Sequence, residues 1–140
     1  RTRRIARLER QIEARVDGAY EVYFNPHAAP GMKGADGMRI LSIQEKKMLT
    51  FTWNAPPTMP EVRKQRTYVT VRFKSLDPNR TEVTLYHGWW GDGGEWDRAF
   101  AYFEKAWTSV LTAFEERFVK GPIDWTEQLK RMRPATPAKS

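Results

Sequence analysis

The chain has 140 residues, which fits one domain with a single buried core, and it has no cysteine, which excludes disulfides, thiolate nucleophiles and cysteine-based zinc sites. Its net charge of +7 comes from the two ends, because residues 1–15 hold six basic and two acidic residues, residues 120–140 hold five and two, and the span between them is neutral. Basic ends of this kind are typical of solvated arms, with contact to phosphates as the alternative, so we expect no nucleic acid partner. The lack of an apolar run near the ~20 residues of a membrane span predicts no membrane partner. The absence of cysteine fits a cytoplasmic location.

The first elements in chain order are a basic segment and a β-hairpin. Residues 1–10 form the basic segment, where the helical spacing of the apolar residues predicts a short helix that runs into a strand. Residues 11–24 alternate apolar and polar side chains around Asp17-Gly18, a pair typical of a type I′ turn. Residues 25–37 are rich in proline and glycine and predict a loop that is long enough to act as a lid.

Two further strands and a second irregular loop follow. Residues 38–43 and 48–53 predict strands that are joined by a tight turn. One face of the second strand carries Leu49, Phe51 and Trp53. The prolines of residues 54–60 cannot donate to a continuous strand ladder, so this stretch predicts an irregular connection.

The clearest hairpin of the chain joins residues 68–74 to residues 81–87. The turn-rich tetrad Asp77–Arg80 separates two runs in which apolar and polar residues alternate. The inward face of this hairpin is predicted to carry Val69, Val71, Phe73, Val83, Leu85 and His87.

A long amphipathic helix is predicted for residues 93–119. Asp92 and Glu95 have the spacing of a capping box at its start. Gly121-Pro122 ends the helix, and residues 121–140 predict a basic, proline-containing tail that is mostly without structure. One apolar stripe runs along the helix and consists of Trp96, Phe100, Phe103, Trp107, Val110, Leu111, Phe114 and Phe118.

Antiparallel strands in sequence followed by one long amphipathic helix predict an α+β fold. We expect a curved antiparallel sheet of about six strands that wraps around the helix and leaves a pocket between them. The domain is expected to span residues 11–120, between the basic segment and the tail.

The order of these segments resembles the START-like, SRPBCC superfamily with its helix-grip fold, and within it the branch named after the activator of the heat-shock-protein-ninety ATPase. The resemblance covers residues 12–118 and is carried by the segments DGAYEVYF, MRILSIQEKKMLTFTWNAPP, RTEVTLYHGWW and EWDRAFAYFEKAWTSVLTAFEERF. The family begins with a strand and one or two short helices, whereas only residues 1–10 precede the first hairpin here. We therefore expect those elements to be missing through truncation of the N-terminus, with a reduced version formed by residues 1–10 as the alternative.

The resemblance implies a cavity for a hydrophobic molecule between the sheet and the helix. Strand alternation and the phase of the helical stripe turn seven side chains toward it, with plain core packing as the alternative for each one. These candidate ligand-binding residues are Phe51, Trp53, Val71, Leu85, His87, Phe103 and Trp107. We expect no catalytic residue, no metal site and no cofactor, because the chain has only two histidines and no nucleotide-binding motif.

Two polar features have both a structural and a functional interpretation. An inward His87 either forms a hydrogen bond with a neighbour or serves a ligand as a donor or a base. The basic run Arg63–Arg66 is typical of a solvated edge, and an electrostatic patch for an acidic partner is the alternative.

Three functions remain open at this point. The first is non-catalytic binding of a small hydrophobic molecule in the cavity. The second, implied by the family, is an interaction module that stimulates the ATPase of a heat-shock chaperone and so takes part in the stress response. The third, borrowed from cyclase and dehydratase relatives in the superfamily, is an enzyme in which His87, Tyr86 or Tyr20 assists proton transfer.

Overall fold

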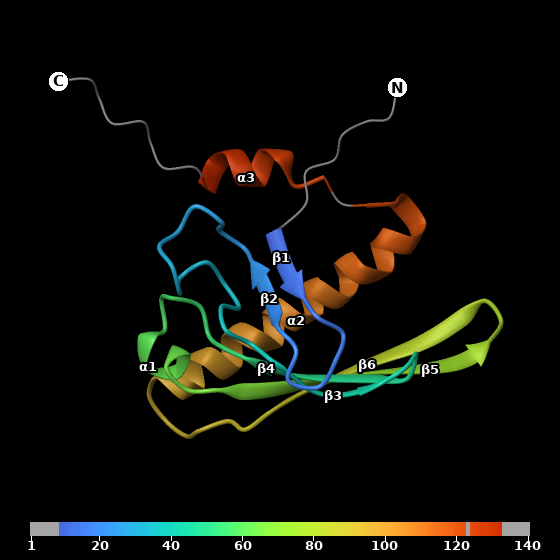
Figure 1. Ribbon diagram of the computed structural model, residues 1–140, viewed down its shortest axis with the longest axis horizontal. Coiled ribbons are helices and arrows are strands. Elements are labelled where there is room, and N and C mark those ends of the chain that lie inside the picture. The colour runs from blue at the N-terminus through green and yellow to red at the C-terminus, as the bar shows by residue number, and fades with distance from the viewer. Residues whose placement is uncertain (1–8, 123, 133–140) are drawn as a thin grey trace.

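The computed structural model describes residues 9–122 and 124–132. Within them, six strands and three helices follow one another along the chain (Figure 1). In chain order these are β1 (Glu9–Ile12), β2 (Tyr20–Tyr23), β3 (Ile40–Gln44), β4 (Met48–Trp53), α1 (Pro60–Arg63), β5 (Thr67–Asp77), β6 (Arg80–Gly88), α2 (Glu95–Lys120) and α3 (Thr126–Met132). Across the described ranges, none of the helices combines the length and apolar character that a membrane span requires.

The strands form two antiparallel sheets. The four strands from β3 to β6 pair in sequence order, and β1 and β2 form a separate hairpin. Two isolated bridges, Ala19 with Arg39 and Tyr23 with Gly34, link this hairpin to the segment that precedes β3. The predicted α+β arrangement of antiparallel strands and a long C-terminal helix is confirmed, and it is that of the helix-grip fold.

The first hairpin has a longer connection than the sequence pattern predicted. Ile12 pairs with Tyr20, so residues 13–19 form the connection and the prediction of a two-residue type I′ turn is wrong. The reason is tertiary, because Asp17 N donates to Ile40 O and Ile40 N donates to Gly18 O. The expected helix in residues 1–8 lies outside the described residues.

The predicted strands of the main sheet are confirmed, although β3 begins two residues later and ends one residue later than predicted. β4 has the predicted bounds, and β5 and β6 extend the hairpin as far as the Asp77–Arg80 pair. The residues predicted to share the inward face lie opposite one another, with Val69 opposite His87 and Val71 opposite Leu85. On β4, Phe51 and Trp53 are buried as expected.

Helix α2 begins two residues later than predicted and without a capping box. Gly94 occupies the cap position, and no side chain caps it. Instead, Glu95 Oε1 accepts a hydrogen bond from Val62 N in α1 at 2.8 Å, and Asp97 Oδ1 accepts one from Gly93 N at 3.2 Å. The Glu95 carboxylate bonds to α1 and not to the start of its own helix, because a buried backbone N–H of α1 lies beside it.

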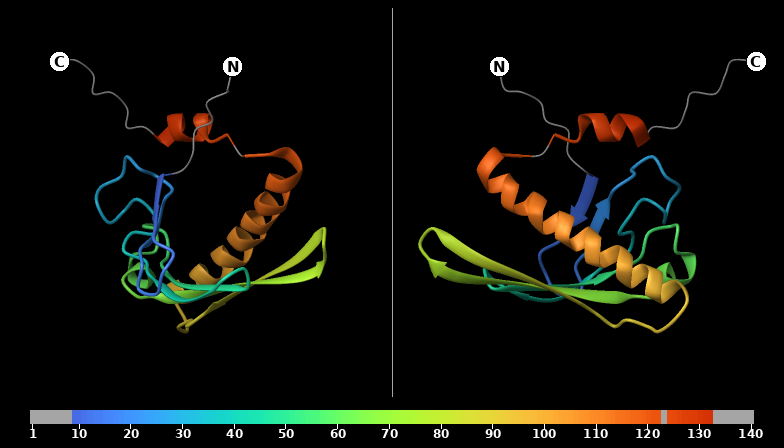
Figure 2. Two further views of the ribbon diagram at one scale, coloured as in Figure 1. Left: turned by 45° about the vertical axis from the view of Figure 1, so that its right-hand side comes forward. Right: turned by 180° about the vertical axis from the view of Figure 1, so that it is seen from behind.

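Helix α2 rises away from the sheet toward its C-terminus (Figure 2). Ala99 and Phe103 in its first half are buried, whereas Phe114 is 41% exposed and Phe118 is 74% exposed. The apolar stripe is therefore only partly covered by the core. That core consists of Ala35, Met38, Phe51, Trp53, Ala55, Val62, Val69, Ala99 and Phe103.

The C-terminal tail contains a helix that the sequence pattern did not predict. α3 follows Trp125, whose carbonyl accepts a hydrogen bond from Leu129 N. Both side chains are half-buried, so this part of the tail has an apolar side. Ile123 and residues 133–140 lie outside the described residues.

Candidate functional site

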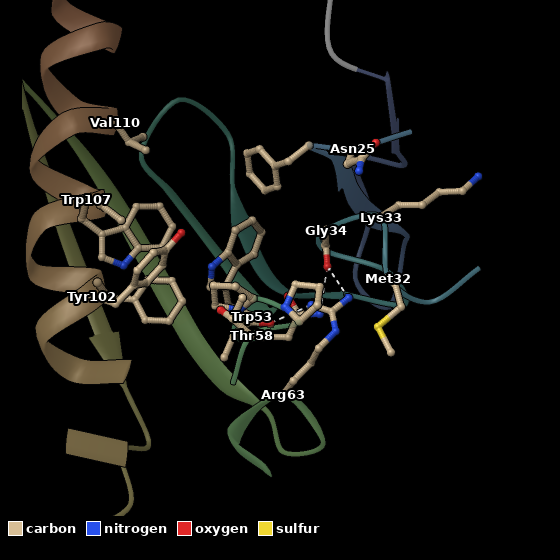
Figure 3. A pocket seen from close by; sticks show the side chains of 17 residues that line it. Asn25, Met32, Lys33, Gly34, Trp53, Thr58, Arg63, Tyr102, Trp107 and Val110 are labelled. Atoms are coloured by element: carbon tan, nitrogen blue, oxygen red, sulfur yellow. Dashed lines mark hydrogen bonds between the residues drawn. The ribbon is translucent and has the colours of Figure 1, made fainter. Parts of the chain in front are cut away.

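A cavity of about 410 Å³ lies between α2 and the two irregular loops, residues 25–37 and residues 54–59 (Figure 3). It is lined by Phe24, Asn25, Met32, Lys33, Gly34, Trp53, Asn54, Ala55, Pro56, Pro57, Thr58, Arg63, Tyr102, Phe103, Ala106, Trp107 and Val110. Most of this lining is apolar, and the proline and glycine content of the loops explains why regular strands do not fill the space.

Aromatic rings form the walls of this cavity. Tyr102 and Trp107 project from α2 toward Trp53 of β4 in Figure 3. The ring centroids of Trp53 and Trp107 are 5.7 Å apart at an interplanar angle of 45°, and the Phe24 ring meets Trp53 edge-on at 6.4 Å. Such rings give a ligand flat apolar surfaces together with polarised edges.

Arg63 ties the two loops of the cavity together. Its Nη1 donates to Ala55 O at 2.6 Å. Its Nη2 donates to Gly31 O at 2.6 Å and to Gly34 O at 3.0 Å. The same nitrogen lies 3.3 Å from Asp36 Oδ2, so the buried positive charge has a carboxylate partner.

The sequence interpretation of Arg63 as part of a solvated or partner-binding edge is wrong. Its residue surface is 9% exposed, whereas Lys64, Gln65 and Arg66 are exposed. Burial lowers the pKa of Arg63, and the Asp36 carboxylate opposes that shift. The side chain turns inward because irregular loops leave carbonyl groups without strand partners, and a guanidinium has donors for several of them.

His87 joins the sheet to helix α2 through a chain of hydrogen bonds. Trp107 Nε1 donates to His87 Nδ1 at 2.9 Å. An indole N–H is only a donor, so Nδ1 carries no proton and Nε2 does. His87 Nε2 then donates to Thr67 Oγ1 at 2.6 Å, and Thr67 Oγ1 donates to Trp53 O at 3.3 Å.

This network defines what His87 can do chemically. Burial lowers the pKa of His87 from 6.5 to about 4, so the ring is neutral at neutral pH. Both ring nitrogens are engaged by protein groups, and the rings of Trp90 and Phe103 pack 4.4 Å and 4.8 Å from it. The geometry gives His87 a structural role and leaves no free nitrogen for a proton-transfer step.

The two tyrosines named with His87 also lie away from the main cavity. Tyr20 stacks on Phe51 with 4.1 Å between ring centroids, and burial raises the pKa of its hydroxyl. Tyr86 is 62% exposed and points to the outer face of the sheet. Among the described residues, no cluster of three or more histidine and carboxylate side chains is arranged to hold a metal ion.

Six of the seven sequence-predicted residues line one or both of two cavities. Trp53, Phe103 and Trp107 line the main one. A second cavity of about 230 Å³ lies further along α2, and its lining includes Phe51, Val71, Leu85 and again Trp107. His87 lines neither, and it supports Trp107, which borders both.

Several lining residues were not found from the sequence. Tyr102 and Ala106 lie on α2 beside the apolar stripe, and a wider helical face would have included them. The sequence pattern did not indicate that Asn54 and Arg63 line a cavity, because polar residues in irregular segments are usually solvated. Met32 lies in the predicted lid loop, whose contact with the cavity depends on the fold.

The comparisons with known proteins give one match. A family model described as Activator of Hsp90 ATPase homolog 1-like protein matches residues 2–118. The searches of curated proteins and of solved structures gave no match.

Replacement of Arg63 by methionine should destabilise the fold. The variant leaves the Ala55 and Gly31 carbonyls without their donor and removes one of the two donors to Gly34 O, so we expect a loss of roughly 2–4 kcal/mol in the free energy of unfolding. Urea denaturation measures it, and Lys64→Met, on an exposed neighbour, should cost under about 0.5 kcal/mol. Equal stability of the two variants would show that Arg63 is not an anchor.

The stability of the protein should fall on acidification through His87. Its pKa is about 4 in the folded state and near 6.5 when unfolded, so the unfolded chain takes up the proton first as pH falls. This contribution is complete above pH 6.5, declines between pH 6.5 and 4, and is lost below, with a total of roughly 2–3 kcal/mol after allowance for partial solvent access.

Urea denaturation across that pH range provides the measurement. His87→Gln should be less stable at neutral pH but should show a flatter pH dependence. His27→Gln, in an exposed loop, should keep the slope of the parent protein. Parallel curves for the parent and His87→Gln would contradict the assignment.

Proposed function

Because the chain belongs to the family of Activator of Hsp90 ATPase homolog 1-like proteins, we propose that its fold serves non-catalytic binding of a small hydrophobic molecule. The observation that carries this proposal is the aromatic-walled cavity of about 410 Å³ between α2 and the two loops. Pockets of this size and character are typical of small-molecule sites in proteins.

The mouth of the cavity supports the proposal. Phe24 is 43% exposed, Met32 49%, Tyr102 45% and Val110 48%. Tyr102 and Val110 come from α2, Phe24 and Met32 come from the segment after β2, and all four line the cavity. A ligand that covers them would gain about 25 cal/mol for each Å² of apolar surface removed from water.

The loops that form the mouth also support reversible entry. Both carry exposed residues at the cavity edge, while Arg63 ties them together at Ala55 and Gly31. A ligand can therefore enter beside Met32 and Thr58 without disturbing the buried anchor. The cavity of the unliganded fold is in this sense largely preformed, which lowers the cost of ordering on binding.

A second candidate, stimulation of a chaperone ATPase, is favoured by a different surface. Tyr68, Tyr86 and Trp89 form an aromatic cluster on the outer face of the sheet, with Tyr68 5.8 Å from Tyr86 and 4.8 Å from Trp89 between ring centroids. Tyr86 is 62% exposed and Trp89 is 64% exposed. Exposed aromatic clusters are frequent anchors of protein interfaces.

Filling the cavity should abolish ligand binding. Ala106→Trp places an indole among the lining residues, whereas Ala101→Trp places the same ring on an exposed position of the same helix. A panel of fatty acids, sterols, flavonoids and other aromatic compounds is screened by thermal shift and native mass spectrometry. A compound at 100 times its dissociation constant adds about 2.7 kcal/mol to the parent protein and raises its melting temperature by a few degrees.

The expected result is a shift for the parent protein and Ala101→Trp and none for Ala106→Trp. No shift and no co-purifying molecule for the parent protein would overturn ligand binding in this cavity. An equal shift for all three proteins would place binding elsewhere.

The chaperone candidate makes a separate prediction. Addition of the protein to an Hsp90 chaperone should raise its ATPase rate, and the double variant Tyr86→Ser/Trp89→Ser should lose most of that effect because its docking rings are gone. Phe118→Ser, at an aromatic residue that is 74% exposed on α2, is the matched control. Unchanged ATPase rates with the parent protein would remove this candidate.

A further inference from the structure

Resting on the proposed function, we propose that the cavity selects a neutral aromatic molecule that carries a hydroxyl or N–H donor, and that Asn54 Oδ1 accepts this donor. Asn54 follows the last residue of β4 and lines the cavity. It is 7% exposed, which makes it one of the few buried polar residues of the described chain. A polar side chain at this depth needs a partner for each of its amide atoms.

One end of the Asn54 amide has a protein partner. Its Nδ2 donates to Gly34 O at 3.0 Å. A carbonyl oxygen accepts only from the amide nitrogen, so this contact fixes the orientation of the side chain and makes the other atom Oδ1, an acceptor. The Gly34 contact thus holds Oδ1 in place from the loop side.

The other end of the amide has no partner within the described residues. Among the described residues, no hydrogen bond reaches Asn54 Oδ1. Every side-chain nitrogen or oxygen in those residues that is shielded from solvent has a hydrogen-bond partner. Because Oδ1 lacks such a partner, it is accessible to solvent. The solvent-accessible space that Asn54 lines is the cavity. A bound apolar ligand would exclude this water, so a ligand with a donor binds better than one without.

The charges around the cavity favour a neutral molecule. Arg63 is already matched by Asp36 and by loop carbonyls. Lys33 places its ammonium over the Tyr23 ring, 5.3 Å from the centroid, and points away from the cavity in Figure 3. The carboxylate of an anionic ligand beside Asn54 would therefore face the Oδ1 oxygen. No unpaired cation among the described lining residues would offset its charge.

The shape of the walls favours an aromatic molecule. Trp53, Tyr102 and Trp107 face the space from two sides (Figure 3), and the Phe24 ring stands edge-on to Trp53. Flat rings pack against such walls by stacking and edge contacts. The Asn54 Oδ1 acceptor, in a site lined mostly by apolar side chains, then distinguishes a donor-bearing ring from its isostere.

Three naphthalene probes test this assignment by isothermal titration calorimetry at neutral pH. 2-Naphthol carries a donor, 2-methoxynaphthalene has the same ring without a donor, and 2-naphthoate is an anion. We expect 2-naphthol to bind about tenfold more tightly than 2-methoxynaphthalene, and 2-naphthoate to bind most weakly. In Asn54→Leu the preference for 2-naphthol should disappear.

A matched control is the other asparagine of the cavity lining. Asn25 Oδ1 already accepts a hydrogen bond from His27 N at 3.2 Å, so Asn25→Leu should keep the preference for 2-naphthol. Nuclear magnetic resonance of the parent protein adds a test that needs no variant. The side-chain amide signals of Asn54 should shift with 2-naphthol far more than with 2-methoxynaphthalene.

The possible results separate this inference from the proposed function. Equal affinity for 2-naphthol and 2-methoxynaphthalene would overturn the donor assignment while ligand binding stands. Retention of the preference in a folded Asn54→Leu, or unmoved Asn54 signals, would assign the acceptor to another group. No binding of any probe, together with a negative compound screen, would overturn both.

Discussion

The hydrogen bond between Trp107 Nε1 and His87 Nδ1 fixes the distance between helix and sheet on which the rest of the structure depends. On the side toward the helix start, apolar residues pack into a closed core. Beyond this contact the helix rises from the sheet, and apolar side chains of its stripe are partly exposed. A buried neutral imidazole suits this position because it accepts from one element and donates to another.

Arg63 makes a cavity wall from segments that have no regular structure. Strands satisfy their backbone groups within the sheet, whereas the loops at residues 25–37 and 54–59 have too many prolines and glycines to do so. A single guanidinium collects three of their carbonyl groups and one carboxylate. The loops can then remain irregular while Ala55, Gly31 and Gly34 are held in place.

The two faces of the sheet have different chemistry, and each suits one candidate function. The inner face and α2 carry enclosed aromatic side chains around a cavity that the Asn54 amide also borders, a combination that suits a small ligand. The outer face presents the exposed rings of Tyr86 and Trp89, which suit a protein surface. Because these features lie on opposite faces, a ligand and a partner would not compete directly.

The sequence by itself determined the strands of the main sheet, the long helix and the inward direction of the strand residues. It did so because alternation and helical spacing are local properties that burial preserves, as the pairing of Val71 with Leu85 illustrates. Only the tertiary structure decided the connection around Asp17, the role of Glu95, the burial of Arg63 and the position of Asn54. In each case the partner lies far away in the sequence, at Ile40, Val62, Gly31 or Gly34, and no local pattern records which distant backbone group will need a hydrogen bond.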